Sequence, residues 1–256
     1  MTSRRRRQAD RPPAATPSPP AAGGGGRLAG LDALRGIAIV AMIAYHFAFD
    51  LRLFGLTSAD FYRDPFWLGS RTLILSSFLL LAGVSLVLAQ RSTTGRARFW
   101  RHVLLIGACA ALVSLASYLA SPARFIWFGV LHAIAVSLVL VRPLVPHPRS
   151  AFVVGATVIA AGNLLSFASF EQPALGWVGF MPAKPATDDY VPLFPWTGVV
   201  LVGIAAGHGL VRRAFRPLAP FARLPAFLSW MGRRSLALYM LHQTLLVAVL
   251  WIGTRR

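Results

Sequence analysis

The sequence predicts an all-α protein, a polytopic bundle of about seven transmembrane helices whose amino end lies in the cytoplasm. Hydrophobic residues make up 56% of the 256 residues and charged residues only 13%, and the mean hydropathy is +0.60, far from the averages of soluble domains. The apolar residues form runs near the length of about 20 residues that crosses the hydrocarbon of a bilayer. The connections between the runs alternate between arginine-rich and charge-balanced composition, as the positive-inside rule requires.

The chain begins with a low-complexity segment. Its basic, proline- and glycine-rich composition lacks apolar periodicity and cannot build a packed core. We therefore expect residues 1–29 to be a disordered tail and 30–252 to be the membrane domain. A basic start before an apolar run also resembles a signal peptide, but no clear small-residue cleavage site follows the run, so we interpret it as an uncleaved first helix.

The connections between the predicted spans differ in their charged residues. Six arginines precede the first span, and the second connection, 91–100, and the last, 212–233, carry arginine without any acid. The connection 51–67 has two arginines against two aspartates and is balanced, the segment 171–192 has three acids against one lysine, and the turn near Pro122 is almost uncharged. This alternation predicts a cytoplasmic amino end and an external carboxyl end. The expected spans, in order, are 31–50, 68–90, 101–120, 124–141, 151–170, 193–211 and 234–252.

The first span carries four ionisable residues, Asp32, Arg35, His46 and Asp50. At about 100° per residue, all four project from one face of a helix. Ionisable groups at membrane depth cost several kcal/mol unless they are paired or hydrated, so this stripe is a candidate functional site. The alternative is a short structural polar seam in the bundle.

The chemistry of the stripe suggests a division of roles. His46 could act as a general base near neutral pH, and Asp50, four residues on, could hydrogen-bond its imidazole. Arg35 lies about 16 Å nearer the cytoplasm, where it could bind the phosphates of a coenzyme or simply pair with Asp32. The alternative for His46 is a structural hydrogen-bonding role.

Further polar residues lie in or near other spans. Arg71, His132 and His242 are candidates to line a cavity with His46, and the alternative for each is an interhelical hydrogen bond. The histidines lack the paired spacing of a metal site, so no metal is expected. The lone Cys109 excludes an intrachain disulfide. The net charge of +18 comes from short arginine clusters between apolar spans, which fits anionic lipid headgroups better than a nucleic acid.

Five ordered blocks of the sequence resemble one protein family, the bacterial branch of the heparan-alpha-glucosaminide N-acetyltransferase catalytic-domain family. The resemblance covers about residues 28–252. The spacing from Arg35 to His46 is also similar to a motif of the related membrane acyltransferases that modify surface polysaccharides. The blocks are LDALRGIAIVAMIAYHFAFDL, FLLLAGVSLVLA, FGVLHAIAVSLVL, VPLFPWTGVVLVGIAAG and MGRRSLALYMLHQTLL.

The resemblance implies a membrane acyltransferase of the bacterial cytoplasmic membrane. Its donor would be acetyl-CoA on the cytoplasmic side, and its acceptor an amino or hydroxyl group of a small molecule or glycan outside. One departure concerns the catalytic histidine, because eukaryotic members have asparagine at the position of His46 and their histidine further on. No histidine lies between His46 and His102 here, so that second site does not carry over.

Two classes of function are left open. In the first, the protein is a transmembrane acyltransferase with His46 as base, Asp50 beside it, and Arg35 with Asp32 at the donor end. In the second, it is a non-enzymatic transporter or permease in which the same stripe lines a substrate or proton path. The absence of a clear internal repeat argues weakly against transport. The sequence leaves the oligomeric state open.

Overall fold

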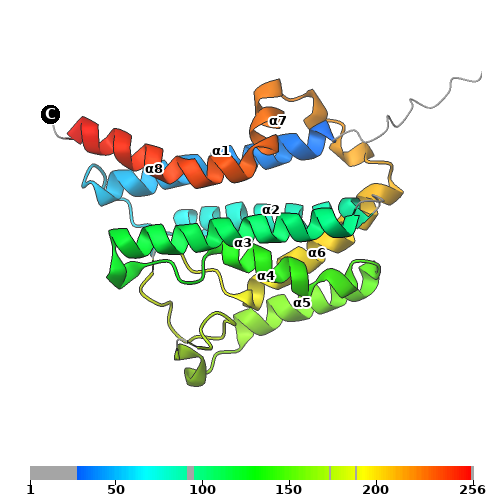
Figure 1. Cartoon of the computed structure of the whole chain (residues 1–256), viewed down its shortest axis with the longest axis horizontal. Coiled ribbons are helices and arrows are strands. Elements are labelled where there is room, and N and C mark those ends of the chain that lie inside the picture. Colours follow the sequence, from blue (N-terminus) through cyan, green and yellow to red (C-terminus); the bar gives the residue numbers. More distant parts are fainter. Residues whose placement is uncertain (1–27, 91–94, 173, 188, 255–256) are drawn as a thin grey trace, which may run out of the picture.

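The computed structural model describes residues 28–90, 95–172, 174–187 and 189–254, and in this part of the chain the regular structure is helical (Figure 1). Most of the predicted tail, 1–29, lies outside the described residues. The α-helices are α1 (Ala29–Leu53), α2 (Pro65–Gln90), α3 (Gly95–Ala120), α4 (Val130–Leu140), α5 (Pro148–Leu164), α6 (Leu193–Arg212), α7 (Ala226–Arg233) and α8 (Ser235–Thr254).

Five of these helices, α1, α2, α3, α6 and α8, are long and apolar enough to cross a membrane. This confirms the all-α membrane class. The fourth and fifth predicted spans, 124–141 and 151–170, correspond to shorter helices, α4 with 11 residues and α5 with 17. The exact number of spans therefore stays a prediction.

Helix α4 begins six residues later than expected because α3 holds the chain that precedes it. The Ser114 hydroxyl donates to the Ile126 carbonyl at 2.6 Å, and the Ile126 amide donates to the Ser117 hydroxyl at 2.9 Å. These bonds satisfy the backbone of Ile126 outside a helix. The segment from Pro122 to Gly129, which begins with a short 3-10 helix (Pro122–Arg124), is thus tied to α3, and α4 begins only after it.

The helices run lengthwise in layers. In Figure 1, α1, α7 and α8 form one layer, α2 and α3 lie beneath it, and α4, α5 and α6 lie beneath these. Helix α1 packs against α7, α8 and α2, and α6 packs against α5 and α2. Large apolar side chains such as Leu104, which is 69% exposed, point outward, as expected for a surface that contacts lipid.

Glycines bring α6 unusually close to its neighbours. A Cβ added to Gly83 on α2 would overlap the carbonyl oxygen of Val200 on α6, and one added to Gly203 on α6 would overlap that of Leu80. Small residues allow such backbone contact. In lipid the hydrophobic effect does not drive helices together, so close van der Waals packing of this kind stabilises the bundle instead. The largest buried cluster, which includes Leu79, Val200 and Ile204, lies beside this contact.

Helix α7 was not predicted from the sequence. Its eight residues lie in the connection 212–233, where the sequence predicts only a basic loop. Backbone contact explains its position, since a Cβ on Gly232 would overlap the carbonyl oxygen of Asp32, and one on Gly36 that of Leu228. Helix α7 therefore packs directly on the first turns of α1.

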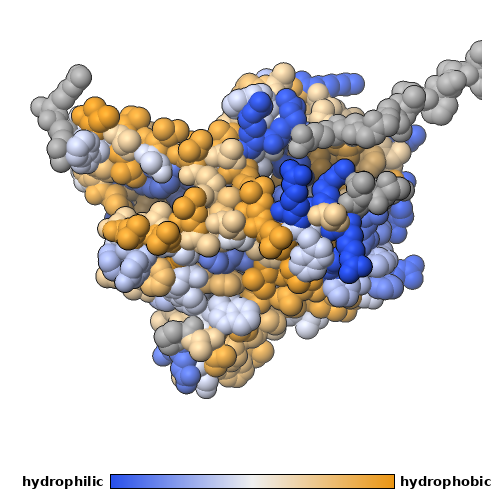
Figure 2. All heavy atoms as spheres, in the orientation of Figure 1, coloured by the Kyte–Doolittle hydropathy of each residue, from blue (hydrophilic) through white to orange (hydrophobic). Residues whose placement is uncertain are grey.

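Basic residues gather at one end of the molecule. Figure 2 shows hydrophilic residues concentrated where α1 begins and α7 lies, while the lengthwise surface is largely apolar. The acidic residues Asp60, Asp64, Glu171 and Asp189 lie in connections at the opposite end. Arginines at the first end include Arg98, Arg101, Arg142, Arg149, Arg212, Arg213, Arg216, Arg223 and Arg233.

Candidate active site

The four ionisable residues of the first span all lie on α1 and form two groups. Asp32 and Arg35 occupy the first turns, at the arginine-rich end, and His46 and Asp50 lie near the other end of the helix. Both carboxylate side chains are buried, each residue being 2% exposed. Because α1 is flanked by α2, α7 and α8, each group can meet partners from several helices.

The first group is an ion pair that joins helices. Arg35 Nη1 donates to Asp32 Oδ1 at 3.1 Å, and Arg35 Nη2 donates to the hydroxyl of Ser85 on α2. His102 on α3 interacts electrostatically with Arg35. The pairing of Arg35 with Asp32 that the sequence suggested is present, together with a hydrogen bond to α2 that the sequence did not indicate.

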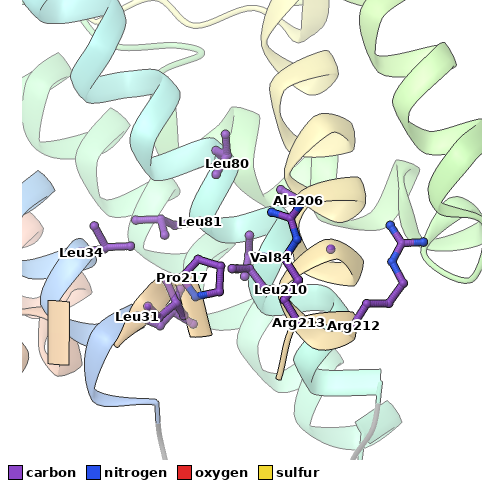
Figure 3. A pocket seen from close by; sticks show the side chains of 12 residues that line it. Leu31, Leu34, Leu80, Leu81, Val84, Ala206, Leu210, Arg212, Arg213 and Pro217 are labelled. Carbon is purple, nitrogen blue, oxygen red and sulfur yellow. The ribbon is translucent and has the colours of Figure 1, made fainter. Parts of the chain in front are cut away.

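A pocket of about 450 Å³ opens beside this group. Its apolar wall is formed by leucines of α1 and α2, including Leu31, Leu34 and Leu81 (Figure 3). The side chains of Arg212 and Arg213 extend from the end of α6 on the other side of the pocket (Figure 3). An apolar wall with two guanidinium groups suits an amphiphilic ligand that carries negative charge.

The second group pairs α1 with α8. Asp50 Oδ1 accepts a hydrogen bond from Gln243 Nε2 at 2.8 Å. The rings of His46 and His242 lie 4.9 Å apart between centroids, tilted by 58°. The four-residue spacing predicted a hydrogen bond between Asp50 and the His46 imidazole. This prediction is wrong, because Asp50 bonds to Gln243 instead. We call His46, Asp50, His242 and Gln243 the α1–α8 polar cluster.

Three atoms of the α1–α8 polar cluster are buried without a hydrogen-bond partner among the described residues. They are Asp50 Oδ2, His242 Nε2 and Gln243 Oε1. A buried polar group without a partner costs about 1–3 kcal/mol, so three such atoms in one place form a candidate binding or catalytic site. Unpaired buried groups are rare in native proteins, so the cluster is the part of the polar stripe to which a functional role is most readily assigned.

The structure places Arg71 near this cluster and His132 elsewhere. Arg71, at the start of α2, interacts electrostatically with Tyr45, whose ring contacts His46 at 5.8 Å edge-on. His132 instead anchors the start of α4: its Nδ1 accepts from the Gly129 amide at 3.2 Å, and its Nε2 lies 3.3 Å from the Ser114 hydroxyl. Of the three candidate cavity residues, His242 alone has a described contact with His46.

The segment between α5 and α6 packs on the start of α4. Asp189 Oδ2 accepts a hydrogen bond from the Val130 amide at 2.8 Å, and the Thr187 hydroxyl donates to the Phe125 carbonyl at 2.8 Å. Burial raises the pKa of Asp189, while the Val130 amide and the charges of Lys184 and Arg71 partly offset the rise. Burial also raises the pKa of Tyr190 to about 12. Asp189 therefore satisfies the first backbone amide of α4 and acts as a cap for this helix.

Sequence reasoning missed two features of the site. Gln243 follows His242 directly in the segment YMLHQ, but nothing local reveals that its side chain crosses to Asp50. Arg213 belongs to a connection that charge counting explains as a topology signal, and its place beside a pocket depends on how α6 ends against α1 and α2. Among the described residues, no three His, Cys, Asp or Glu side chains gather into a metal site.

Comparison with known proteins gives one match. The family model described as heparan-alpha-glucosaminide N-acetyltransferase, catalytic, matches residues 27–244. No curated protein and no solved structure matches the chain. The match includes both groups of α1, the pocket beside the first group, and all four residues of the α1–α8 polar cluster.

Proposed function

The chain belongs to the heparan-alpha-glucosaminide N-acetyltransferase catalytic family, and we propose on this basis that it moves an acetyl group across a membrane. The donor is acetyl-CoA on the cytoplasmic side. The acceptor is an amino or hydroxyl group of a small molecule or glycan on the far side. The membrane is the cytoplasmic membrane of a bacterium. Family membership supports an acyltransferase, and the site supports the division of roles described below.

The observation that carries the proposal is the arrangement of α1. One helix bears an arginine group beside a pocket at its basic end, and a histidine beside unpaired buried acceptors eleven residues further on. At 1.5 Å per residue the two groups are about 16 Å apart along the helix. A donor that is held by its phosphates at one end and reacts at the other needs such a separation.

The arginine-rich end is the cytoplasmic end in this proposal. Positively charged connections are retained on the cytoplasmic side of membranes, and the acidic connections lie at the opposite end of the helices. With this orientation the pocket beside Leu31 and Arg213 faces the compartment that contains acetyl-CoA. The amino end lies inside and the carboxyl end of α8 lies outside.

Reporter fusions test this orientation. We expect fusions after residues 96, 147 and 220 to report a cytoplasmic location, and fusions near residues 58 and 185 to report an external one. The physical reason is that the first three sites lie in arginine-rich connections and the other two in connections that carry acids. Alkaline phosphatase and fluorescent-protein activities measure the two locations. Two or more reversals would contradict the orientation and the placement of Arg35 at the donor end.

The donor site in this proposal combines Arg35 with the pocket. Acetyl-CoA carries several phosphates, and a guanidinium binds phosphate through charge-assisted hydrogen bonds. Arg212 and Arg213 extend beside the pocket, and Arg35 stands one turn from Leu31 and next to Leu34, which line it. Asp32 orients Arg35 through the ion pair at 3.1 Å.

Removing these charges is expected to weaken donor binding. We expect Arg213→Ala and Arg35→Ala each to raise the Kd for acetyl-CoA about 10-fold or more, because each removes a charge-assisted bond to phosphate. Isothermal titration with purified protein measures the Kd, and the weakening should be smaller at high salt. Arg149→Ala is the matched control, since Arg149 lies at the same end but does not line the pocket. Equal Kd values for all three variants and the wild type would contradict the assignment.

The transfer step in this proposal uses His46 as general base. As the acceptor's nitrogen or oxygen attacks the thioester carbonyl carbon, His46 takes the proton from that atom. The tetrahedral intermediate then collapses, the carbon–sulfur bond breaks, and the sulfur leaves with the electron pair as a thiolate. The thiolate takes up the proton that His46 holds, which regenerates the neutral imidazole. The buried Asp50 carboxylate near His46 stabilises the imidazolium that forms.

A labelled donor tests the proposal as a whole. Protein reconstituted in liposomes is incubated with acetyl-labelled CoA on the arginine-rich side and with bacterial envelope fractions on the other. We expect label in an acceptor of the envelope fraction and free CoA on the donor side. Uptake of an envelope solute without any acetyl transfer would favour the permease instead.

A further inference from the structure

The ring of His242 is held in one orientation by the backbone. Its Nδ1 lies 2.6 Å from the carbonyl oxygen of Tyr239, in the preceding turn of α8. A carbonyl oxygen can only accept, so Nδ1 carries the hydrogen and donates it. In the neutral ring the second nitrogen, Nε2, then holds the lone pair. The backbone of α8 therefore fixes which nitrogen of His242 is basic.

That basic nitrogen is buried and has no partner among the described residues. His242 is 8% exposed, and Nε2 receives no hydrogen bond. Its ring lies against His46, at 4.9 Å between centroids. Asp50, which the Gln243 amide holds at 2.8 Å, presents a second carboxylate oxygen that is also unpaired. Two imidazoles in ring contact and a carboxylate thus lie together between α1 and α8.

We propose that His242 is the proton-accepting partner of His46, so that two imidazoles hold the proton that leaves the acceptor. This inference rests on the proposed acyl transfer. After His46 takes the proton from the acceptor, it passes a proton to His242 Nε2, while His242 Nδ1 keeps its hydrogen on the Tyr239 carbonyl. His242 becomes an imidazolium near the Asp50 carboxylate. The proton returns through His46 to the departing thiolate, so atoms and charges balance.

Other ionisable groups face the pair from several elements. The Tyr45 ring contacts His46 at 5.8 Å, and the Tyr239 ring contacts His242 at 5.6 Å. Arg71 on α2 interacts electrostatically with Tyr45, and Asp189, in the segment before α6, with Tyr239. In this inference the two histidines and the carboxyl groups of this set govern the pH dependence of the reaction.

The variant His242→Asn tests proton transfer separately from the hydrogen bond between residue 242 and the Tyr239 carbonyl. The asparagine amide nitrogen occupies a position close to Nδ1 and can still donate to the Tyr239 carbonyl, but nothing replaces Nε2. We expect unchanged thermal stability and an unchanged Kd for acetyl-CoA, with kcat lowered about 10 to 10²-fold. The logarithm of the wild-type rate should rise with a slope of two on the acid side of the pH profile, because both imidazoles must be neutral. In His242→Asn the slope should fall to one.

His208→Gln is the matched control. His208 on α6 is also bonded through a ring nitrogen to a backbone carbonyl, with Nε2 at 2.8 Å from the oxygen of Val145, but it lies outside the α1–α8 polar cluster. Glutamine keeps a donor at that position. We expect wild-type kcat and an acid slope of two for this variant.

The outcomes distinguish this inference from the proposed function. If wild-type protein transfers acetyl and His242→Asn does so at the same rate with the same slope, the histidine pair is wrong and the acyltransferase stands. If wild-type protein transfers no acetyl to envelope acceptors or to small amines, both are overturned. If His242→Asn does not fold, the wild-type profile decides, since an acid slope of one contradicts the pair and a slope of two supports it.

Discussion

His46→Ala protein is expected to lose about 10² to 10⁴ of its turnover while it keeps its affinity for acetyl-CoA. The substitution removes the proposed base from the transfer step and leaves the arginine group at the start of α1 intact. His46 is half-buried, and its described contacts are ring contacts with Tyr45 and His242. Alanine at this position therefore leaves no hydrogen-bonding group without its partner, and the variant should insert and fold. Initial rates and the Kd for the donor, measured on purified protein in liposomes, check both parts.

Asp50→Asn is the companion variant to His46→Ala. Asparagine can still accept the hydrogen bond from Gln243, but it lacks the charge that favours the imidazolium. We expect a smaller loss of turnover than for His46→Ala. If well-folded His46→Ala protein transferred acetyl at the wild-type rate, the catalytic interpretation of α1 would be wrong, and the polar stripe would be a structural seam.

Gly83→Leu is expected to destabilise the bundle by about 3 kcal/mol or more, enough to prevent recovery of folded protein from a marginally stable bundle. A side chain at this position of α2 would overlap the carbonyl oxygen of Val200 on α6. The obstacle is backbone, which no change of rotamer can move away. Thermal unfolding in detergent and the yield of monodisperse protein on size exclusion measure the effect.

Gly69→Leu is the control on the same helix. A Cβ on Gly69 meets nothing within 4 Å, so the new side chain points into open space. We expect a midpoint of thermal unfolding close to that of the wild type. A similar loss in both variants would mean that glycine is needed for a reason other than the approach of α2 to α6.

The positions of the long helices could be predicted because the signal is local. The predicted spans 31–50, 68–90, 101–120, 193–211 and 234–252 fall within α1, α2, α3, α6 and α8 or match them closely. A run of apolar residues must form a helix in lipid, where each backbone amide and carbonyl needs a partner within the segment. Neighbouring helices do not change that requirement, so the sequence is sufficient.

The shorter elements could not be predicted in the same way. The bounds of α4 and α7 depend on partners distant in sequence. Asp189 caps α4, and Gly232 of α7 packs closely against the backbone carbonyl of Asp32. Neither helix is long enough for apolar content to define its ends. Their ends are decided by which backbone groups find a partner elsewhere in the fold.

The sequence by itself determined that a membrane helix carries Asp32, Arg35, His46 and Asp50 on one face, because helical periodicity places them there. Only the tertiary structure decided what that face meets. It joined Arg35 to Ser85 and set His46 and Asp50 against His242 and Gln243, from a helix almost 200 residues away in the chain. Packing between helices depends on shape and on close backbone approach over the whole bundle, and no local pattern of residues encodes the partner.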